Sequence, residues 1–394
     1  MRTFMRPTIG SVLICVFVAC SVFLVGATAS AQCQPQWLPG DGLPGADGPV
    51  SSTAMWDPDG LGPLPPRLVV GGSFSVMGSV AANRIAAFDP ATSTWSALGS
   101  GMNSNVLALA VLPNGDLVAG GNFTTAGGVP ASCIARWNGS AWSSLGSGVD
   151  NSVTALAVLP NGDLVAGGFF STADGVTANR IARWNGSVWS ALGSGMNNTV
   201  NALAVLPNGD LVAGGFFTTA GGVTANRIAR WNGSAWSSLG SGVDNAVTAL
   251  AVLPNGDLVA GGGFTTAGGV AANGIARWNG SAWSSLGSGA NGVSALAVLP
   301  NGDLVAGGGF TTAGGVPARC IARWNGSSWS SLGSGMHSSV LALAMLPTGD
   351  LVAGGGFTTA GGQVSAYIAR YATPCPATVA ITGTACASSG GANT

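Results

Sequence analysis

The sequence predicts an all-β fold: a seven-bladed β-propeller of four-stranded antiparallel blades, whose last blade is closed by an N-terminal strand. The first reason is a repeat, because one unit recurs almost unchanged every 47 residues, as from Val153 to Val200. A period of this size is typical of propellers and solenoids. The second reason is that each unit contains four strand-like segments. The third is that one unit is divided between the two ends of the chain.

The repeat limits how individual residues are interpreted. A side chain present in every copy is expected to build the blade rather than to catalyse a reaction. Six clear copies and a degenerate first one are found, and they begin at Val50, Val106, Val153, Val200, Val247, Val293 and Val340.

Composition favours strands over helices. The chain has 13 basic and 14 acidic side chains, all of them Arg or Asp, so the helix-forming residues Lys and Glu are absent. The 65 glycines have no three-residue period, which excludes collagen. A formal net charge of −1 offers no electrostatic footprint for nucleic acid or an anionic membrane.

Residues 1–31 are expected to be a signal peptide. Arg2 and Arg6 precede an apolar run from residue 9 to 25, and residues 29–31 (Ala-Ser-Ala) form a small-residue cleavage site. An uncleaved anchor is the alternative. We therefore expect a secreted, periplasmic or envelope protein with no membrane span after cleavage.

One repeat contains four strands in order. The segment ALAVL is followed by PNG and then DLVAGG, and Asn-Gly between two apolar runs indicates a hairpin. A polar loop, TTAGGVTAN, leads to RIARW, and a second NGS turn leads to WSSLG. We call these strands A to D. The B-to-C and D-to-A connections are expected on one face, where the copies differ most.

The ends of the chain predict closure of the ring. The last copy stops after strand C, at Tyr367 to Tyr371, and the missing strand D is found at Gln36 to Leu38. A blade completed by both termini leaves no exposed sheet edge. The propeller is thus predicted over residues 33–376, followed by a tail at 377–394.

The repeat resembles the delta-60 type of β-propeller repeat through the strings ALAVLPNGDLVAGG and FTTAGGV and the later IARWNG. Kelch and galactose-oxidase propellers are more distant relatives. The pattern GGxFT, IAxWNG and WxxLGSG is similar to ectodomains of fungal cortical polarity markers. The resemblance implies a propeller of secreted or envelope type, here bacterial, often without a known ligand. The tail resembles the opening of a C-terminal module that is cut short.

Asp and Arg recur together, which indicates an ion pair within each blade. The alternative, a ring of anion-binding arginines, would leave partly buried charges unpaired. Both are lost from the first unit, where Arg67 and Ala87 stand at the two positions. The other six copies keep Asp116, Asp163, Asp210, Asp257, Asp303 and Asp350 with Arg136, Arg183, Arg230, Arg277, Arg323 and Arg370.

Paired tryptophans, such as Trp137 with Trp142, allow two interpretations. They could form a carbohydrate platform, but their recurrence favours packing between blades. The NGS turns at Asn138 and its equivalents also match the N-glycosylation pattern, although turn chemistry already accounts for Asn-Gly there.

One polar side chain precedes strand A in every blade and is the candidate ligand-binding ring at the channel mouth. Asp and Asn oxygens could bind a cation or a small polar ligand, or these residues could simply suit a tight link. We expect no metal and no cofactor. The ring comprises Asp47, Asn103, Asp150, Asn197, Asp244, His337 and, in a shortened link, Asn291.

Catalytic constellations are lacking, so we expect a protein that is not an enzyme. His337 is the single histidine, Tyr367 and Tyr371 are the only tyrosines, and no Glu is present. A galactose-oxidase-like copper site would need more His and Tyr ligands than these, and a sialidase-like site would need a Glu. No Gly-rich segment leads to a Lys-Ser/Thr pair for phosphate.

The cysteines fit export. Cys33 and Cys375 are expected at facing ends of the closing hairpin and form the candidate disulfide, with Cys375–Cys386 as the alternative. Cys133 and Cys320 lie several blades apart and are expected to be buried thiols.

We conclude from the sequence that the chain is a monomeric, non-catalytic scaffold or binding module for an unknown protein or glycan. A glycan or surface-polymer binder, or a structural envelope protein without a specific ligand, are the alternatives. Recognition is expected on the face with the variable loops.

Overall fold

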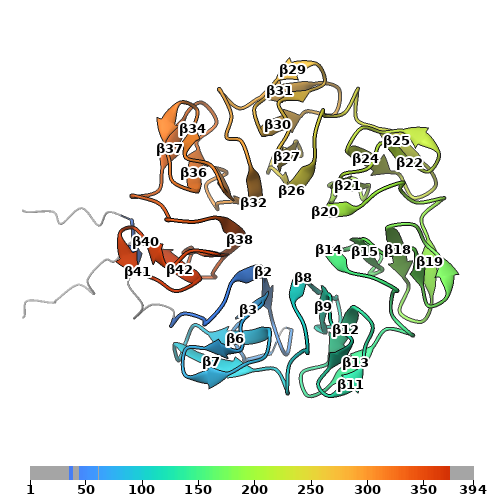
Figure 1. Ribbon diagram of the computed structural model, residues 1–394, viewed down its shortest axis with the longest axis vertical. Helices are drawn as coiled ribbons and strands as arrows, with labels where there is room; N and C mark the ends of the chain where they lie inside the picture. The colour runs from blue at the N-terminus through green and yellow to red at the C-terminus, as the bar shows by residue number, and fades with distance from the viewer. Residues whose placement is uncertain (1–34, 39–43, 61, 373–394) are drawn as a thin grey trace, which may run out of the picture. The chain divides into compact units, whose positions relative to one another are not determined.

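The structure is a computed structural model that describes residues 35–38, 44–60 and 62–372, and all regular elements within them are β-strands (Figure 1). The expected signal peptide, the tail at 377–394 and the candidate disulfide Cys33–Cys375, with its alternative partner Cys386, lie outside these residues. No helix that could span a bilayer occurs in the described segments.

Seven four-stranded antiparallel sheets surround a central axis, which confirms the predicted seven-bladed propeller (Figure 1). The innermost strands, A, are β2 (Val50–Trp56), β8 (Val106–Val111), β14 (Val153–Val158), β20 (Val200–Val205), β26 (Val247–Val252), β32 (Val293–Val298) and β38 (Val340–Met345). Strands B are β3 (Arg67–Gly72), β9 (Leu117–Gly121), β15 (Leu164–Gly168), β21 (Leu211–Gly215), β27 (Leu258–Gly262), β33 (Leu304–Gly308) and β39 (Leu351–Gly355).

The two outer positions complete each blade. Strands C are β6 (Ile85–Asp89), β12 (Ile134–Trp137), β18 (Ile181–Trp184), β24 (Ile228–Trp231), β30 (Ile275–Trp278), β36 (Ile321–Trp324) and β42 (Ile368–Ala372). Strands D are β7 (Thr94–Ala97), β13 (Trp142–Ser144), β19 (Trp189–Ala191), β25 (Trp236–Ser238), β31 (Trp283–Ser285), β37 (Trp329–Ser331) and, for blade 7, β1 (Gln36–Leu38).

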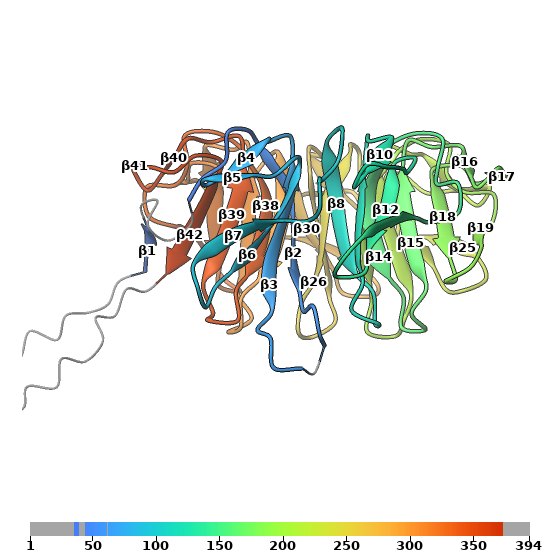
Figure 2. The same ribbon diagram turned by 90° about the horizontal axis from the view of Figure 1, so that it is seen from below.

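The polar B-to-C loop has regular structure that the sequence analysis did not predict. In every blade it contains a hairpin of two-residue strands. These hairpins lie along one side of the molecule in Figure 2, which we call the hairpin face. They pair β4 (Val76–Met77) with β5 (Val80–Ala81), β10 (Thr125–Ala126) with β11 (Val129–Pro130), β16 (Thr172–Ala173) with β17 (Val176–Thr177), β22 (Thr219–Ala220) with β23 (Val223–Thr224), β28 (Thr266–Ala267) with β29 (Val270–Ala271), β34 (Thr312–Ala313) with β35 (Val316–Pro317), and β40 (Thr359–Ala360) with β41 (Gln363–Val364).

The D-to-A links share the hairpin face, as predicted. Met102 of the link into blade 2 forms an antiparallel bridge with Ala126 of the hairpin of that blade, and Val149 of the next link does the same with Ala173. The A-to-B and C-to-D turns therefore occupy the opposite side, which we call the turn face.

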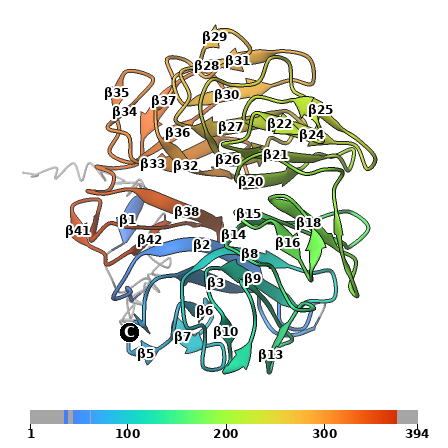
Figure 3. The ribbon, with the colours of Figure 1, turned by 45° about the vertical axis from the view of Figure 1, so that its right-hand side comes forward.

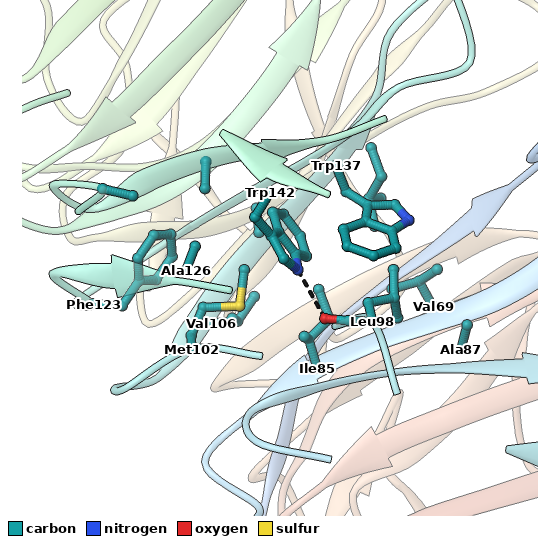
Figure 4. Close-up of a cluster of buried hydrophobic side chains, with 14 of the residues drawn as sticks. Val69, Ile85, Ala87, Leu98, Met102, Val106, Phe123, Ala126, Trp137 and Trp142 are labelled. Atoms are coloured by element: carbon teal, nitrogen blue, oxygen red, sulfur yellow. Dashed lines mark hydrogen bonds between the residues drawn. The ribbon is translucent and has the colours of Figure 1, made fainter. Parts of the chain in front are cut away.

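The apolar residues of strands B and C explain why blades pack face to face. Val165 and Ile181 of blade 3 and Leu211 and Ala213 of blade 4 are fully buried in one cluster. Both faces of each blade are covered by neighbouring blades, so these strands are nearly continuous runs of apolar residues. Figure 4 shows the equivalent cluster between blades 1 and 2.

The N-terminal strand closes the ring as the split repeat predicted. β1 pairs antiparallel with β42, with Trp37 opposite Tyr371 and Leu38 opposite Arg370 (Figure 3). The link into blade 1 adds a second connection, because the Ala46 amide donates a 3.0 Å hydrogen bond to the carbonyl of Ala366. Every blade thus has four strands.

Candidate binding surfaces

The candidate ring of polar residues lies on the hairpin face, where six of its seven members hold the B-to-C loop of the blade they enter. In blade 3, Asp150 Oδ1 accepts hydrogen bonds from the amides of Ser171 (2.8 Å) and Thr172 (3.0 Å). His337 Nδ1 does the same for Thr358 and Thr359 in blade 7. Equivalent pairs of amides bond to Asp47, Asn103, Asn197 and Asp244.

Asn291 is exposed and makes no such bond to the loop of its blade within the described residues, because the sixth link is shorter. There the Gly292 amide bonds directly to the carbonyl of Gly262. None of the seven residues lines the central cavity of about 230 Å³, which is bordered by three consecutive residues from each strand A. The hydrogen bonds of the ring therefore shape the loops, and its members are absent from the lining of this cavity.

Two ring members also border grooves between blades on the hairpin face. Asp244 lines a groove of about 360 Å³ with Arg227 between blades 4 and 5. His337 lines one of about 450 Å³ with Arg319 between blades 6 and 7. In the described part of the chain, no three His, Cys, Asp or Glu side chains gather closely enough to hold a metal ion.

Hydrogen bonding controls the ionisation of the ring carboxylates. Burial raises the pKa of Asp47, Asp150 and Asp244, but the hydrogen bonds from their loops outweigh it, and each pKa lies below the ordinary value. Asp174, which replaces a hairpin glycine, has its pKa lowered chiefly by the hydroxyl and amide of Ser147. The charged form is favoured because each carboxylate accepts several hydrogen bonds.

Acid is expected to weaken the hairpin face. Since the folded pKa is depressed, the stabilisation is fully present above the ordinary Asp value near 3.8 and is lost as pH falls through the folded pKa. The melting temperature of the wild-type protein should therefore decrease as the pH is lowered below about 4. The variant D47N/D150N/D244N should show a flatter profile, because Asn at Asn103 and Asn197 already accepts the same amides. Equal slopes for the two proteins would contradict this role.

The hairpin face also carries two aromatic side chains that the sequence analysis did not single out. Phe169 and Phe216 follow strand B in the neighbouring blades 3 and 4 and are 50% and 45% exposed. The amide of Phe169 bonds to the carbonyl of Ser152, which lies just before the innermost strand. The other five blades have small or polar residues there: Ser73, Asn122, Gly263, Gly309 and Gly356.

An arginine accompanies each of these phenylalanines. Arg180 and Arg227 precede strand C in the same two blades, with φ of 65°. Arg227 Nη1 donates to the carbonyl of Phe216 at 2.8 Å, and Arg180 Nη1 to that of Phe170 at 3.0 Å. Each half-buried guanidinium group is thus bonded to the backbone at or next to an exposed phenylalanine, Arg227 at Phe216 itself and Arg180 at the residue after Phe169.

The turn face contains the predicted ion pairs within each blade, which the structure confirms. Arg136 Nε lies 3.5 Å from Asp116 Oδ2, and the pairs of blades 3 to 5 have the same geometry at 3.6 Å. Blades 6 and 7 pair Arg323 with Asp303 and Arg370 with Asp350. Blade 1 was not expected to hold a pair, yet Arg67 lies 3.8 Å from Asp89.

The two tryptophans of each unit have different environments. The strand D tryptophan joins neighbouring blades, because Trp142 Nε1 donates a 2.8 Å hydrogen bond to the carbonyl of Leu98 in the preceding blade (Figure 4). This confirms its predicted packing role. The strand C tryptophan is buried only in blade 2, as Trp137, and remains half-buried as Trp184, Trp231, Trp278 and Trp324.

A groove lies between adjacent blades on the turn face. Between blades 2 and 3 it has a volume of about 270 Å³, and its lining includes Leu112, Arg136, Trp184 and Asn185. Between blades 6 and 7 the equivalent Leu299, Arg323 and Tyr371 line a groove of about 190 Å³.

The NGS turns that border these grooves are fixed by their asparagines. Asn185 Oδ1 accepts hydrogen bonds from the amides of Ser187 and Val188, the pattern of an Asx-turn. Each Asn-Gly therefore has a local structural reason, as expected.

The two cysteines inside the propeller are free, as predicted, but only Cys320 is buried and Cys133 is half-buried. Burial raises the pKa of Cys133 and Cys320; the charge of Asp150 adds to the effect at Cys133, and that of Arg319 opposes it at Cys320. Their thiolate forms are therefore disfavoured at neutral pH.

Two propeller families match parts of the chain. Residues 64–189 match the Rax2 C-terminal β-propeller domain, and residues 206–234 match a β-propeller domain of unknown function, DUF5122. No curated protein matches. The chain is thus a β-propeller repeat protein, in agreement with its structure.

Solved propellers share the fold at low sequence identity. The extracellular domain of a one-component system from B. thetaiotaomicron is 11% identical, with a TM-score of 0.57 over 85% of this chain and 39% of that one. The RRP9 WD40 repeats are 13% identical, with a TM-score of 0.56 over 86% and 99%. The WD40 propeller of Doa1 is 15% identical, with a TM-score of 0.55 over 85% and 96%. At these identities the likeness concerns the fold alone.

Proposed function

We propose that the chain is an exported, non-catalytic interaction module of the delta-60 repeat type that binds a protein partner on its hairpin face. The partner contacts a surface made by Phe169, Phe216 and the neighbouring Arg180 and Arg227, here called the Phe169–Phe216 patch. Export is supported by the N-terminal sequence. The proposal depends above all on the exposure of two phenylalanines in adjacent blades.

Exposed aromatic side chains at this position are a departure from the repeat. The scaffold around them is nearly identical from blade to blade, and the other blades fold with Gly, Asn or Ser at the same site. The rings are therefore not needed to build a blade. Aromatic side chains with arginines beside them are enriched where protein partners bind most tightly.

The residues around the Phe169–Phe216 patch suit a partner segment that has an apolar side chain flanked by polar groups. Phe216 is next to Arg227, which also lines the groove of about 360 Å³ between blades 4 and 5. A partner segment could place an apolar residue against the rings and a carbonyl or carboxylate oxygen near the guanidinium group.

The test replaces both phenylalanines by glycine, the residue that blades 5, 6 and 7 have at this position. The variant F169G/F216G should keep the melting temperature within about 3 °C of wild type, since surface changes alter stability little. Immobilised wild-type protein is exposed to extracellular and envelope proteins of the source cells, and captured proteins are quantified by mass spectrometry. Purified candidates are then titrated against both proteins.

We expect at least one purified partner to bind wild type and to lose about tenfold or more in affinity for F169G/F216G, because each hot-spot ring contributes more than about 1 kcal/mol. The matched control is V188A, which changes a 55% exposed side chain on the turn face to the alanine of other blades. If no partner discriminates between wild type and F169G/F216G, the proposal fails. Sedimentation of the protein alone identifies the case in which a second copy is the partner.

A further inference from the structure

We propose that the grooves of the turn face between blades 2 and 7 bind the repeating units of a neutral polysaccharide, one sugar ring in each groove. This surface lies opposite the Phe169–Phe216 patch, so the two proposals succeed or fail separately. The binding groups are the strand C aromatic residue, the strand C arginine of the preceding blade and the asparagine of the NGS turn.

The two walls of a groove come from neighbouring blades. Arg136 of blade 2 and Trp184 of blade 3 both line the groove between these blades. The same relation joins Arg323 to Tyr371, whose pKa is raised by burial and partly restored by the charge of Arg323. Trp184 is held in place by Trp189, with ring centroids 5.4 Å apart. The ring of Trp184 and the guanidinium group of Arg136 therefore line one groove from two different blades.

The polar groups in the groove can mostly donate hydrogen bonds. The salt bridge occupies the Nε edge of Arg136, and its other nitrogens make no hydrogen bond within the described residues. The indole N–H of Trp184 and the side-chain amide nitrogen of Asn185 are also without a partner there. A ligand rich in hydroxyl and ether oxygens meets these donors, while its C–H face can lie on the ring.

Charge and size narrow the ligand class. Each arginine is neutralised by the aspartate of its own blade, so the groove offers no net positive charge to an anionic polymer. A volume of about 270 Å³ lies just below the range of sites for drug-sized ligands, so it suits a single ring. These two features favour an uncharged sugar.

The recurrence of the same binding groups at several interfaces favours a polymer over a peptide. The same residue types recur at the interfaces of blades 3–4, 4–5 and 5–6, where Trp231, Trp278 and Trp324 are half-buried. A chain of identical units can occupy several identical grooves, and linked contacts raise overall affinity by factors of 10² to 10⁴. A peptide would have to repeat its own sequence to do the same.

The interfaces between blades 1 and 2 and between blades 7 and 1 are not proposed as binding sites, because large side chains of blade 1 fill them. Trp56 stands where other blades have the leucine that lines the groove, is 4% exposed and donates to the carbonyl of Gly115. It covers Trp137, so the interface between blades 1 and 2 is closed. Phe88 is fully buried at the interface between blades 7 and 1. Grooves are present at the interfaces of blades 2–3 and 6–7, and the interfaces between them carry the same residue types.

The test uses soluble dextran, pullulan, laminarin and mannan, each followed by tryptophan fluorescence and by titration calorimetry. We expect one of these polymers to bind wild type and to shift its emission, with at least about 100-fold weaker binding of the corresponding monosaccharide. The variant N185D/N232D/N279D/N325D removes the amide donors and adds charge. It keeps the turn, because Asp89 has the same position in blade 1, where its Oδ1 accepts from the amide of Ala91.

This variant should lose at least about tenfold in affinity for the polymer, a change expected from four weakened linked contacts. The matched control N138D alters the same turn beside the closed interface and should bind like wild type, as should F169G/F216G. The proposal is overturned if none of the four polymers binds, if the quadruple variant binds equally well, or if polyproline or an anionic polysaccharide binds more tightly.

Discussion

Replacing Trp37 by alanine is expected to lower the free energy of unfolding by about 3–5 kcal/mol, the usual cost of removing a buried tryptophan. Trp37 is 4% exposed, and its Nε1 donates a 2.9 Å hydrogen bond to the carbonyl of Leu332 in blade 6. Its ring centroid lies 5.0 Å from that of Tyr371. It is the main buried side chain of the three-residue strand that completes blade 7.

Urea unfolding and limited proteolysis measure this effect. Trp37→Ala should release β1, so cleavage near the N-terminus should appear under conditions in which wild type is resistant. The control Trp236→Ala removes the equivalent side chain within a continuous blade, which donates in the same way to Leu192. It should be similarly destabilised without early N-terminal cleavage. A Trp37→Ala protein that melts within about 2 °C of wild type would show that closure does not depend on this residue, since a loss of about 3 kcal/mol would shift the melting temperature of a domain of this size by about 4 °C.

Gly215→Ala is expected to be among the most damaging changes of a single methyl group, at about 3 kcal/mol, the upper part of the usual range for overpacking. A Cβ at this position would meet the carbonyl oxygen of Thr199 and the Cα of Val200. These are backbone atoms beside the bulge where β20 pairs with β21, so no side-chain movement relieves the contact. Chemical denaturation measures the loss.

The variant Gly222→Ala distinguishes the free-energy cost of a steric contact from the cost of placing a side chain on a left-handed backbone. Gly222 has φ of 83° in the hairpin of the same blade, and nothing lies within 4 Å of a Cβ built there. Its substitution should cost only the penalty of about 1–2 kcal/mol for left-handed geometry. If Gly222→Ala proves more destabilising than Gly215→Ala, backbone conformation rather than packing governs these repeats.

The fold followed from the sequence because its determinants are local and repeated. Asn-Gly turns, apolar runs and a constant period place each strand within its own unit, and strands within a blade are sequence neighbours. The split unit likewise placed Gln36 to Leu38 beside Tyr371. The ion pair of Arg136 with Asp116 was predictable for the same reason, since both residues belong to one blade.

Binding surfaces depended on contacts that no single unit contains. Trp137 and Trp184 occupy the same position in almost identical repeats, yet one is buried and the other half-exposed. The difference comes from the preceding blade, where Trp56 replaces a leucine and fills the groove over Trp137. The polar residues before strand A also acquired their role only when the loops folded against them, as Asp150 does with Ser171. The sequence by itself determined the blades and their number, because these arise from short-range turns and pairing; only the tertiary structure decided which side chains remain open to a ligand, because burial is set by the neighbouring blade.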